Sequence, residues 1–512
     1  MLVKTFGSAL LGIDAIIITV EVSITKGVNF FLVGLPDNAV KESHQRIATA
    51  LENIGFRMPG RRIVINMAPA DIRKEGSAYD LTLAVGILAA SGQIGGDRTG
   101  EYLIMGELSL DGSLRPVKGA LPIAIKAIEA GFKGFILPLQ NAREAAIVKG
   151  LEVYGAVHLS EVAGFFGGTA DLQPVRVDAR KEFLERANDP DMDLADVRGQ
   201  ENVKRALEIA AAGSHNVLMI GSAGSGKTML ARCLPSILPP FTMQESLETT
   251  KIHSVAGRTG SRHSLMTRRP FRSPHSTITA AAMVGGGGMP QPGEVSLSHN
   301  GVLFLDELPE FQRTVLEVMR QPLEDRKIEI SRSKYSVSYP AGFMLVASMN
   351  PCPCGYYNHP EKDCVCPPGM VRKYLNRISG PLLDRIDIHI EVAPVPFEKL
   401  YDKRNAESSA KVRERVAAAR QVQEKRFRHT RNIHCNAQMT SRMLHEHCAT
   451  GSAGRLLLKN AMHKLGLSAR AYDRILKLSR TIADLDSSAR IETIHLAEAI
   501  QYRSLDREAW AG

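Results

Sequence analysis

The chain has 512 residues, of which 44% are hydrophobic and 23% are charged, and its formal net charge is +10. This composition is typical of a globular protein and excludes a disordered or low-complexity chain, and the length suggests about three domains with separate cores. The apolar stretch 9–22 is interrupted by Asp14 and Glu21. We therefore expect neither a signal peptide nor a membrane span, and a cytoplasmic location. The positive charge favours a polyanionic partner, although a diffusely basic surface is a common alternative.

The first segment, residues 1–168, alternates strand-like and helix-like runs, which is typical of an α/β domain. Strands are predicted at 16–22, 30–33 and 62–67, and helices at 38–51, 80–90 and 120–130. The polar segment 169–193 contains two prolines and several charges. It is predicted to be a linker into a second, larger unit.

An apolar run at 216–220 leads into a glycine-rich loop that ends in Lys227 and Thr228, and a helix-prone segment follows. A strand, a loop of this pattern and a helix together predict a P-loop for ATP or GTP. Backbone N–H groups and the helix N-terminus would bind the phosphates, Lys227 would reach the β- and γ-phosphates, and Thr228 would hold Mg²⁺. The alternative is a plain glycine-rich turn. The predicted nucleotide-binding residues are Gly221, Ser222, Ala223, Gly224, Ser225, Gly226, Lys227 and Thr228.

Two further apolar runs have the pattern of buried parallel strands, and each ends in polar residues. The run 301–305 is followed by Asp306 and Glu307, and the run 343–349 by Asn350. Open α/β sheets place their ligands at the carboxyl ends of such strands. Asp306 would bind Mg²⁺, Glu307 would polarise the attacking water, and Asn350 would orient it. This set favours hydrolysis over mere binding, with two solvated acids at a strand end as the alternative.

Two basic segments are candidate nucleic-acid contacts. Residues 251–293 contain no Asp or Glu, and their basic side chains include Arg268, Arg269 and Arg272. The alternating pattern at 327–339 predicts a β-hairpin with Arg332 and Lys334 at its tip. Contacts from such side chains to phosphates would give affinity without base specificity. For the hairpin, a solvated edge whose charges prevent aggregation is the alternative.

Arg385 lies well beyond the nucleotide-binding segments in the sequence. Such an arginine can act in trans, by stabilising transition-state charge in the site of a neighbouring subunit. Arg377 is a second candidate for this role. The alternative for Arg385 is an ordinary surface ion pair with Asp384 or Asp387.

Four of the seven cysteines form one cluster, with two C-x-C pairs separated by nine residues. Clustered thiols in a cytosolic protein more often hold Zn²⁺ than form disulfides. A structural zinc site is therefore predicted, and a redox-sensitive loop is the alternative. The candidate ligands are Cys352, Cys354, Cys364 and Cys366. Beyond residue 390 the pattern becomes helical: 409–428 is predicted to be a solvated surface helix, and several more helices are expected after 437.

The order of these motifs resembles the ComM/YifB family of magnesium-chelatase-like AAA+ ATPases, through essentially the whole chain. Ser276 stands where the family usually has a second histidine, so no role is assigned to that position. The motifs that carry the resemblance are 221–228, 268–275, 284–287, 292–297, 305–307, 349–355 and 382–387.

The resemblance implies an α/β fold in three parts. A P-loop AAA+ core at 194–395 would carry a helix-2 insert, the hairpin before the sensor strand and the cysteine cluster. A helical lid would follow at 396–512, in which Arg470 would reach the γ-phosphate and Arg474 could exchange roles with it. The first 168 residues resemble a Lon-protease-like domain, through 73–81 and 106–112.

The Lon-like domain is expected to be proteolytically inactive, because a Ser–Lys dyad needs a lysine beside the serine hydroxyl. Ala78 or a neighbour occupies the position of the serine, and residues 119–122 carry no lysine where one would be expected. Ser77 is near but offset. The domain is therefore expected to serve as a scaffold for assembly or DNA handling.

The resemblance further implies a homo-oligomeric, hexameric ring that uses ATP and Mg²⁺. Its expected partners are single-stranded and branched DNA, with recombination proteins as possible further partners. The implied activity is branch migration of recombination intermediates during natural transformation. The alternative is a chelatase-type motor that remodels a protein client.

Overall fold

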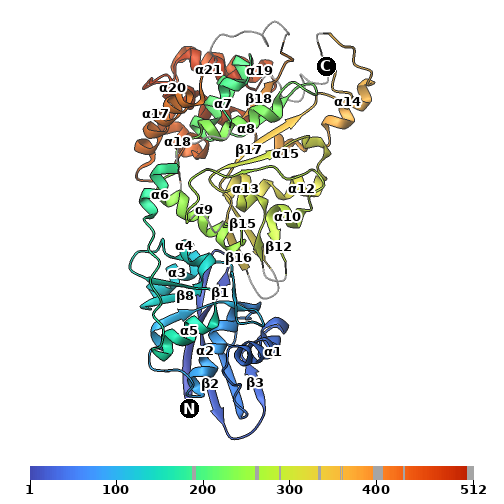
Figure 1. The fold of residues 1–512 in the computed structure, drawn as a ribbon. Coiled ribbons are helices and arrows are strands. Elements are labelled where there is room, and N and C mark those ends of the chain that lie inside the picture. The colour runs from blue at the N-terminus through green and yellow to red at the C-terminus, as the bar shows by residue number, and fades with distance from the viewer. Residues whose placement is uncertain are drawn as a thin grey trace.

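The computed structural model describes residues 1–186, 192–259, 264–287, 290–331, 336–357, 359, 361–395, 407–430 and 433–503. The chain runs from an N-terminal α/β domain at one end of an elongated molecule, through a central α/β core, to a helical C-terminal region (Figure 1). The mixed α/β fold with a parallel sheet is therefore confirmed. Among the described residues, no helix has both the length and the apolar character needed to cross a bilayer.

The N-terminal domain contains a seven-stranded sheet in the order β3-β4-β2-β1-β5-β8-β9. The central pairs β1–β2 and β2–β4 are antiparallel, and the remaining pairs are parallel. Of these strands, β1, β5, β8 and β9 had not been predicted from the sequence. The strands are β1 (Leu2–Leu11), β2 (Asp14–Thr25), β3 (Phe30–Val33), β4 (Arg62–Ala68), β5 (Tyr102–Ile104), β8 (Gly134–Pro138) and β9 (Glu152–Ala156), and a small hairpin joins β6 (Glu107–Leu108) to β7 (Leu114–Arg115).

Helix α2 (Asp80–Ala90) is the centre of this domain, because every one of its residues is buried. A helix that is apolar all round needs cover on all sides. Strands β1 and β2 cover one side of α2, and helices α1 and α5 contact others. The remaining helices of this part are α1 (Asn38–Asn53), α3 (Ala120–Glu129), α4 (Leu139–Ala145), α5 (Leu159–Gly167) and, within the predicted linker, α6 (Ala179–Arg186).

The central core contains a parallel five-stranded sheet in the order β11-β14-β17-β10-β18. Every residue of β10, β14 and β17 is buried, as expected of parallel strands covered on both faces. Their carboxyl ends lie at the same edge, where the sequence placed the nucleotide. The strands are β10 (Val217–Ile220), β11 (Phe271–Arg272), β14 (Val302–Leu305), β17 (Met344–Met349) and β18 (Ile388–Glu391).

Helices pack on both faces of this sheet, and residues of β10 alternate between the two. Val217 and Met219 pack in one apolar cluster with α7, α8 and the C-terminal helices, whereas Leu218 and Ile220 pack in a second cluster on the opposite face. The helices of the core are α7 (Glu201–Gly213), α8 (Lys227–Ile237), α9 (Met243–Val255), α10 (Ala280–Val284), α11 (Glu294–Leu297), α12 (Arg313–Val318), α13 (Arg320–Asp325), α14 (Pro368–Leu375) and α15 (Gly380–Leu383).

Two hairpins extend from the core toward the N-terminal domain (Figure 1). One joins β15 (Lys327–Ser331) to the antiparallel strand β16 (Ser336–Pro340), as the alternating pattern predicted. Its predicted basic tip, with Arg332 and Lys334, lies outside the described residues. The other is short and pairs β12 (Gly285–Gly286) with β13 (Gln291–Pro292).

The N-terminal domain contacts the core at the hairpin and at α9. Gly119 N donates a hydrogen bond to Ser254 O at 3.0 Å. A Cβ atom on Gly12, in the β1–β2 turn, would come within 2.5 Å of Val337 Cγ1, so this close approach requires glycine. The N-terminal domain therefore packs directly on β16, one strand of the predicted DNA-binding hairpin.

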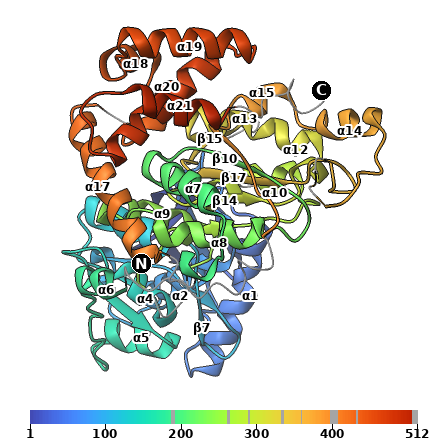
Figure 2. The ribbon, with the colours of Figure 1, turned by 90° about the horizontal axis from the view of Figure 1, so that it is seen from above.

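The C-terminal helices form a lid beside the core sheet, and α14 lies on the other side of the core (Figures 1 and 2). Helix α17 had been predicted to be a solvated surface helix, and this is wrong. One stripe of its side chains is buried, and the helix contacts α7, α8 and α20. The lid helices are α17 (Ser409–Phe427), α18 (Ser441–His447), α19 (Ser452–Lys464), α20 (Ala469–Leu485) and α21 (Thr493–Gln501).

Candidate nucleotide-binding site

The loop at 221–226 leaves the carboxyl end of β10 and closes where α8 begins at Lys227. Gly224 and Gly226 have φ angles of 78° and 92°, in the left-handed region that glycine adopts without strain. A Cβ at Gly221 would lie 2.3 Å from Val392 O, so the close approach of β18's extension also requires glycine. The loop therefore has the backbone of a phosphate cradle at a helix N-terminus.

Lys227 is buried at the centre of this loop. Its Nζ donates hydrogen bonds to Gly221 O and Ser222 O, both at 2.8 Å, and to Asn350 Oδ1 at 3.3 Å. Burial lowers the pKa of Lys227, and the nearby carboxylate of Asp306 opposes that shift. The structure thus brings together the lysine and the asparagine that the sequence assigned to the γ-phosphate region.

The predicted Mg²⁺ ligands are adjacent. Thr228 Oγ1 donates a hydrogen bond to Asp306 Oδ2 at 2.9 Å, and Ser348 Oγ donates one to Asp306 Oδ1. A hydroxyl and a carboxylate at the P-loop are oxygen donors that suit Mg²⁺. Sequence reasoning missed Ser348. Its signal was its place two residues before Asn350, since β17 lies beside β14 in the sheet.

The loop also contains a polar atom that suits a phosphate. Ser225 Oγ is buried and has no hydrogen-bond partner among the described residues. Leaving a buried hydroxyl unpaired costs free energy, which a phosphate oxygen would recover. Together with Lys227 and the Thr228–Asp306 pair, this orphaned group indicates that the site fits a nucleoside triphosphate with Mg²⁺.

Glu307 has an unusual backbone. Its φ is 54°, in the left-handed region that non-glycine residues rarely adopt, and its N–H donates to Asp306 Oδ1 at 3.1 Å. Such strained residues cluster at functional sites. The conformation leaves the Glu307 side chain exposed at the ligand edge of the sheet. A general base for water would need this accessibility.

Asn350 follows β17 and receives support from Tyr374 on α14. Burial raises the pKa of the Tyr374 phenol to about 12, and hydrogen bonding to the backbone of Asn350 opposes that shift. The phenol is therefore neutral at physiological pH. Sequence reasoning had no reason to select Tyr374, which lies 24 residues beyond Asn350.

Arg385 is at the edge of the sheet opposite the P-loop. Its carbonyl accepts a hydrogen bond from Asn216 Nδ2 at 2.9 Å, just before β10 begins. The four residues of β10 then separate it from Gly221, a length of roughly 13 Å at ~3.3 Å per residue. The side chain is 11% exposed and forms an ion pair with Glu324 rather than with Asp384 or Asp387. Arg385 is thus distant from its own P-loop.

Arg377, the second candidate, forms an ion pair with Glu310 at 2.8 Å and is half exposed. In the lid, Arg470 is 67% exposed, and its closest carboxylate oxygen, Asp384 Oδ2, is 3.8 Å away. Arg474 instead donates to the buried carboxylate of Asp387 at 2.7 Å. The two lid arginines therefore do not exchange roles: Arg474 joins the lid to the core, and Arg470 is accessible.

Arg269, a predicted DNA contact, is engaged inside the core. Its guanidinium group donates to Pro239 O at 2.7 Å and Asn300 O at 2.8 Å, and it pairs with Glu245 at 3.1 Å. It also lies over the ring of Phe241. These contacts fix the start of α9, so the DNA role expected of Arg269 is withdrawn.

Arg272 is likewise paired internally. Its Nη2 and Nε donate to the two carboxylate oxygens of Glu294 at 2.8 and 2.6 Å. A bidentate pair of this kind leaves little capacity for a phosphate, and the DNA role of Arg272 is withdrawn as well. Arg268 is exposed and remains a candidate.

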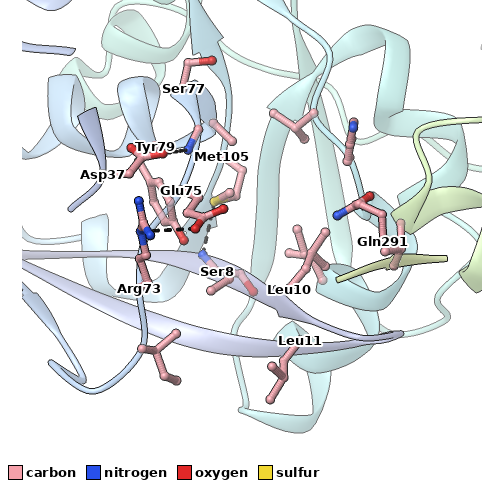
Figure 3. Close-up of a pocket in the computed structure, with 18 of the residues that line it drawn as sticks. Ser8, Leu10, Leu11, Asp37, Arg73, Glu75, Ser77, Tyr79, Met105 and Gln291 are labelled. Carbon is pink, nitrogen blue, oxygen red and sulfur yellow. Dashed lines mark hydrogen bonds and ion pairs between the residues drawn. The ribbon is translucent and has the colours of Figure 1, made fainter. Parts of the chain in front are cut away.

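Among the described residues of the N-terminal domain, no Ser–Lys pair is found at the predicted position. Ser77 Oγ donates to the carboxylate of Glu107, and Ala78 follows. A cavity of about 410 Å³ lies here, between the domain and the core. Figure 3 draws Ser77 on one side of the cavity and Gln291, from the core, on the other. The described contacts of Ser77 therefore give no support for proteolysis.

Three family models match the chain: magnesium chelatase subunit ChlI at 193–400, ChlI of Mg-chelatase at 20–141, and the ChlI C-terminal region at 406–503. The uncharacterized protein YifB of Escherichia coli is 45% identical over 503 residues, which cover 98% of this chain and 96% of that protein. The competence protein ComM of Haemophilus influenzae is 43% identical over 504 residues, covering 98% and 97%. The chain belongs to the ComM/YifB family of magnesium-chelatase-like AAA+ proteins.

Membership in this family implies an ATPase core around the site described above. A shorter similarity is to Lon protease 2 of Bacillus subtilis, 31% identical over 147 residues, or 28% of this chain. This similarity, together with the α/β topology, confirms a Lon-like component in the fold.

Proposed function

We propose that this protein is a ring-forming ATPase that moves along DNA. The observation that carries the proposal is the division of the hydrolytic machinery between two edges of one sheet. The P-loop, Asp306, Glu307 and Asn350 lie at the carboxyl edge, whereas Arg385 lies at the opposite edge. An arginine so placed can stabilise transition-state charge only in a neighbouring copy's site. A closed ring, hexameric by family resemblance, satisfies every such site.

Within one site, each group has a defined task. Thr228 and Asp306 would hold Mg²⁺, which neutralises phosphate charge when ATP is bound. Glu307 accepts a proton from the attacking water, and Asn350 orients that water. Arg385 from the adjacent subunit and Arg470 from the lid approach the γ-phosphate as charge develops.

DNA as the track is supported by charge and by similarity. The chain carries a net charge of +10, and a basic tip is predicted for the β15–β16 hairpin. The relative from Haemophilus influenzae bears the name competence protein ComM. We therefore propose single-stranded and branched DNA as substrates, branch migration as the activity, and natural transformation as its setting, with recombination proteins as partners.

The test measures the ATPase rate with and without single-stranded DNA, alongside disruption of a labelled three-stranded junction. We expect stimulation by DNA and ATP-dependent junction movement, both lost in Glu307→Gln. The same assay with Arg332→Ala/Lys334→Ala should retain basal ATPase and lose stimulation.

A second candidate is a protein-remodelling motor, which the similarity to magnesium chelatase subunits favours. ATPase activity that is indifferent to DNA, with no junction movement, would contradict the DNA motor and support this second function.

A further inference from the structure

The loop between β17 and α14 brings four thiols together. Their sulfur atoms all lie within 4.8 Å of one another. Three of the sulfur pairs are separated by 3.3 Å (Cys352–Cys354), 3.6 Å (Cys354–Cys364) and 3.7 Å (Cys352–Cys364). Four sulfurs at ~2.3 Å from a tetrahedral Zn²⁺ stand about 3.8 Å apart. A disulfide would need ~2.05 Å. The cluster therefore has the dimensions of a closed Cys₄ metal site.

The contacts around the four cysteines are those expected of a structural metal site. Tyr357 N donates a hydrogen bond to Cys352 Sγ at 3.3 Å, a contact that would stabilise this sulfur as a thiolate ligand. Four protein sulfurs leave no open position for a reacting molecule, so the site is structural rather than catalytic. Soft thiolate ligands in tetrahedral arrangement select Zn²⁺ over Mg²⁺.

The loop that carries the four cysteines, between β17 and α14, borders the nucleotide site. Cys352 is buried and lies two residues beyond Asn350, which contacts Lys227. At the turn between the first two thiols and the rest, Gly355 has φ 82°, and a Cβ there would lie 3.8 Å from the backbone nitrogen of Ala223. The loop thus passes close to the P-loop at Gly355, and it follows directly after Asn350. It also lies away from the lid, toward α14 (Figure 2).

We propose that these four cysteines bind one structural Zn²⁺ as thiolates, and that the metal fixes the loop against the P-loop so that Asn350 stays in place for catalysis. Binding releases the four thiol protons to solvent and changes no oxidation state. The effect of the metal on Asn350 rests on the proposed ATPase function, whereas the binding of zinc does not.

None of the described side chains between 351 and 367 belongs to the hydrophobic clusters of the core, and of the four thiols only Cys352 is fully buried. Val365, between the last two thiols, is 81% exposed. Without metal the loop therefore has little to hold it together, whereas the sheet beneath keeps its own core. Loss of zinc should loosen the catalytic geometry without unfolding the domain.

The test is elemental analysis of the purified full-length protein, together with its binding of a fluorescent ATP analogue and its ATPase rate. We expect one equivalent of zinc in the wild type and in Cys448→Ala, a control for a buried thiol outside the cluster. The double variant Cys364→Ser/Cys366→Ser should lose the zinc and, through displacement of Asn350, lose about tenfold or more in turnover. The single variant Cys366→His, which keeps four zinc ligands, should retain both the zinc and the turnover.

Metal and activity are read separately, so the two proposals fail in different ways. Absence of zinc from the wild type, iron in its place, or full zinc in the double variant would overturn the metal site. Zinc loss with unchanged turnover and nucleotide affinity would overturn the coupling to Asn350. Stoichiometric zinc in a wild type that never hydrolyses ATP would contradict the proposed function and leave the metal site standing. Circular dichroism checks that the double variant folds like the wild type. If the double variant is unfolded, Cys366→Ser is compared with Cys366→His instead.

Discussion

At the scale of single residues, the nucleotide site depends on a few polar contacts made across neighbouring strands. Lys227 is held by two carbonyls of its own loop and by Asn350, and Asp306 receives hydroxyl hydrogen bonds from Thr228 and Ser348. Asp306 is therefore positioned by two donors before any metal arrives. In the proposed mechanism, this arrangement would hold Mg²⁺ in a fixed position and leave the exposed, strained Glu307 to act as the base.

Replacement of Glu307 by Gln should separate nucleotide binding from hydrolysis. The amide keeps the size of the side chain but cannot accept a proton, so turnover should fall by about 10²–10⁴-fold. Affinity for an ATP analogue should stay within a few-fold of the wild type, because Lys227 and the loop amides are unchanged. Lys227→Ala is the contrasting variant and should lose binding itself. A Glu307→Gln protein with wild-type turnover would show that another group is the base.

At the scale of single elements, neighbouring helices and strands decide where Arg385 and the lid lie. Arg385 sits between α15 and β18, held by Glu324 of α13, and its backbone is tied to the start of β10. The strand separates it from its own P-loop. Helix α17 buries one stripe of its side chains against α7 and α20, and its charged residues lie outside that stripe.

Arg385→Ala should reduce turnover by about 10³-fold or more while the variant's own pocket still binds nucleotide. The control Glu324→Gln removes the same ion pair and keeps the arginine, so it should retain activity. Mixing Arg385→Ala with Lys227→Ala should restore part of the activity, since some mixed interfaces contain an intact pocket and an intact arginine. An Arg385→Ala protein that hydrolyses ATP normally in an assembled ring, or a defect found instead in Arg377→Ala, would move the role elsewhere.

The buried stripe of α17 can be tested with two valines on the same helix. Val416 is fully buried and Val422 is 43% exposed. Val416→Ala should lower the free energy of unfolding by about 2 kcal/mol, because it removes buried methyl groups and leaves a cavity. Val422→Ala should change it by no more than about 0.5 kcal/mol. Urea unfolding of both variants checks this, and equal effects would mean that α17 does not pack as described.

At the scale of the whole molecule, the lid and the core share a buried polar contact. Asp387, at the start of β18, receives hydrogen bonds from Arg474 of α20 and from Asn216 N, and His215 lies beside it. Burial by itself would raise the pKa of Asp387, but Arg474 and His215 outweigh it and hold that pKa well below its usual range. The lid is thus attached through a charge pair at the sheet edge that also carries Arg385. The N-terminal domain contacts the opposite end of the core, at the hairpin.

Stability should fall in mild acid through the buried histidine of β18. Burial lowers the pKa of the His389 imidazole to about 3, and the backbone N–H of His389 donates to Tyr502 O at the end of the lid. Because the folded state excludes the proton that the unfolded histidine binds below about pH 6.5, the free energy of unfolding should decline as pH falls from 6.5 toward 3. The slope from this one group is at most about 1.4 kcal/mol per pH unit.

His389→Gln should flatten this decline, since glutamine does not titrate. Urea unfolding at several pH values between 4 and 8 compares the two proteins. Parallel curves for wild type and His389→Gln would show that the buried histidine does not set the acid sensitivity.

The sequence by itself determined the P-loop, the two acids after β14, the asparagine after β17 and the cysteine pairs, because each is a contiguous pattern whose local geometry the chain itself enforces. It also determined the family, and with it the three-part α/β organisation. Only the tertiary structure decided the roles of residues whose partners are distant in sequence. Arg269 and Arg272 belong to internal pairs with Glu245 and Glu294.

Partners that are distant in sequence also decided the remaining roles. Arg470 and Arg474 lie one turn apart on α20 and look alike in the sequence, but only Arg474 meets Asp387, 87 residues earlier. Ser348 and Tyr374 join the site through partners on other segments, Ser348 with Asp306 and Tyr374 with the backbone of Asn350. The apolar stripe of α17 was present in the sequence among many charges, but its burial depended on α7, α8 and α20 being there to cover it. Long-range partners decide such cases, because an ion pair or a buried face is a property of two segments and not of one.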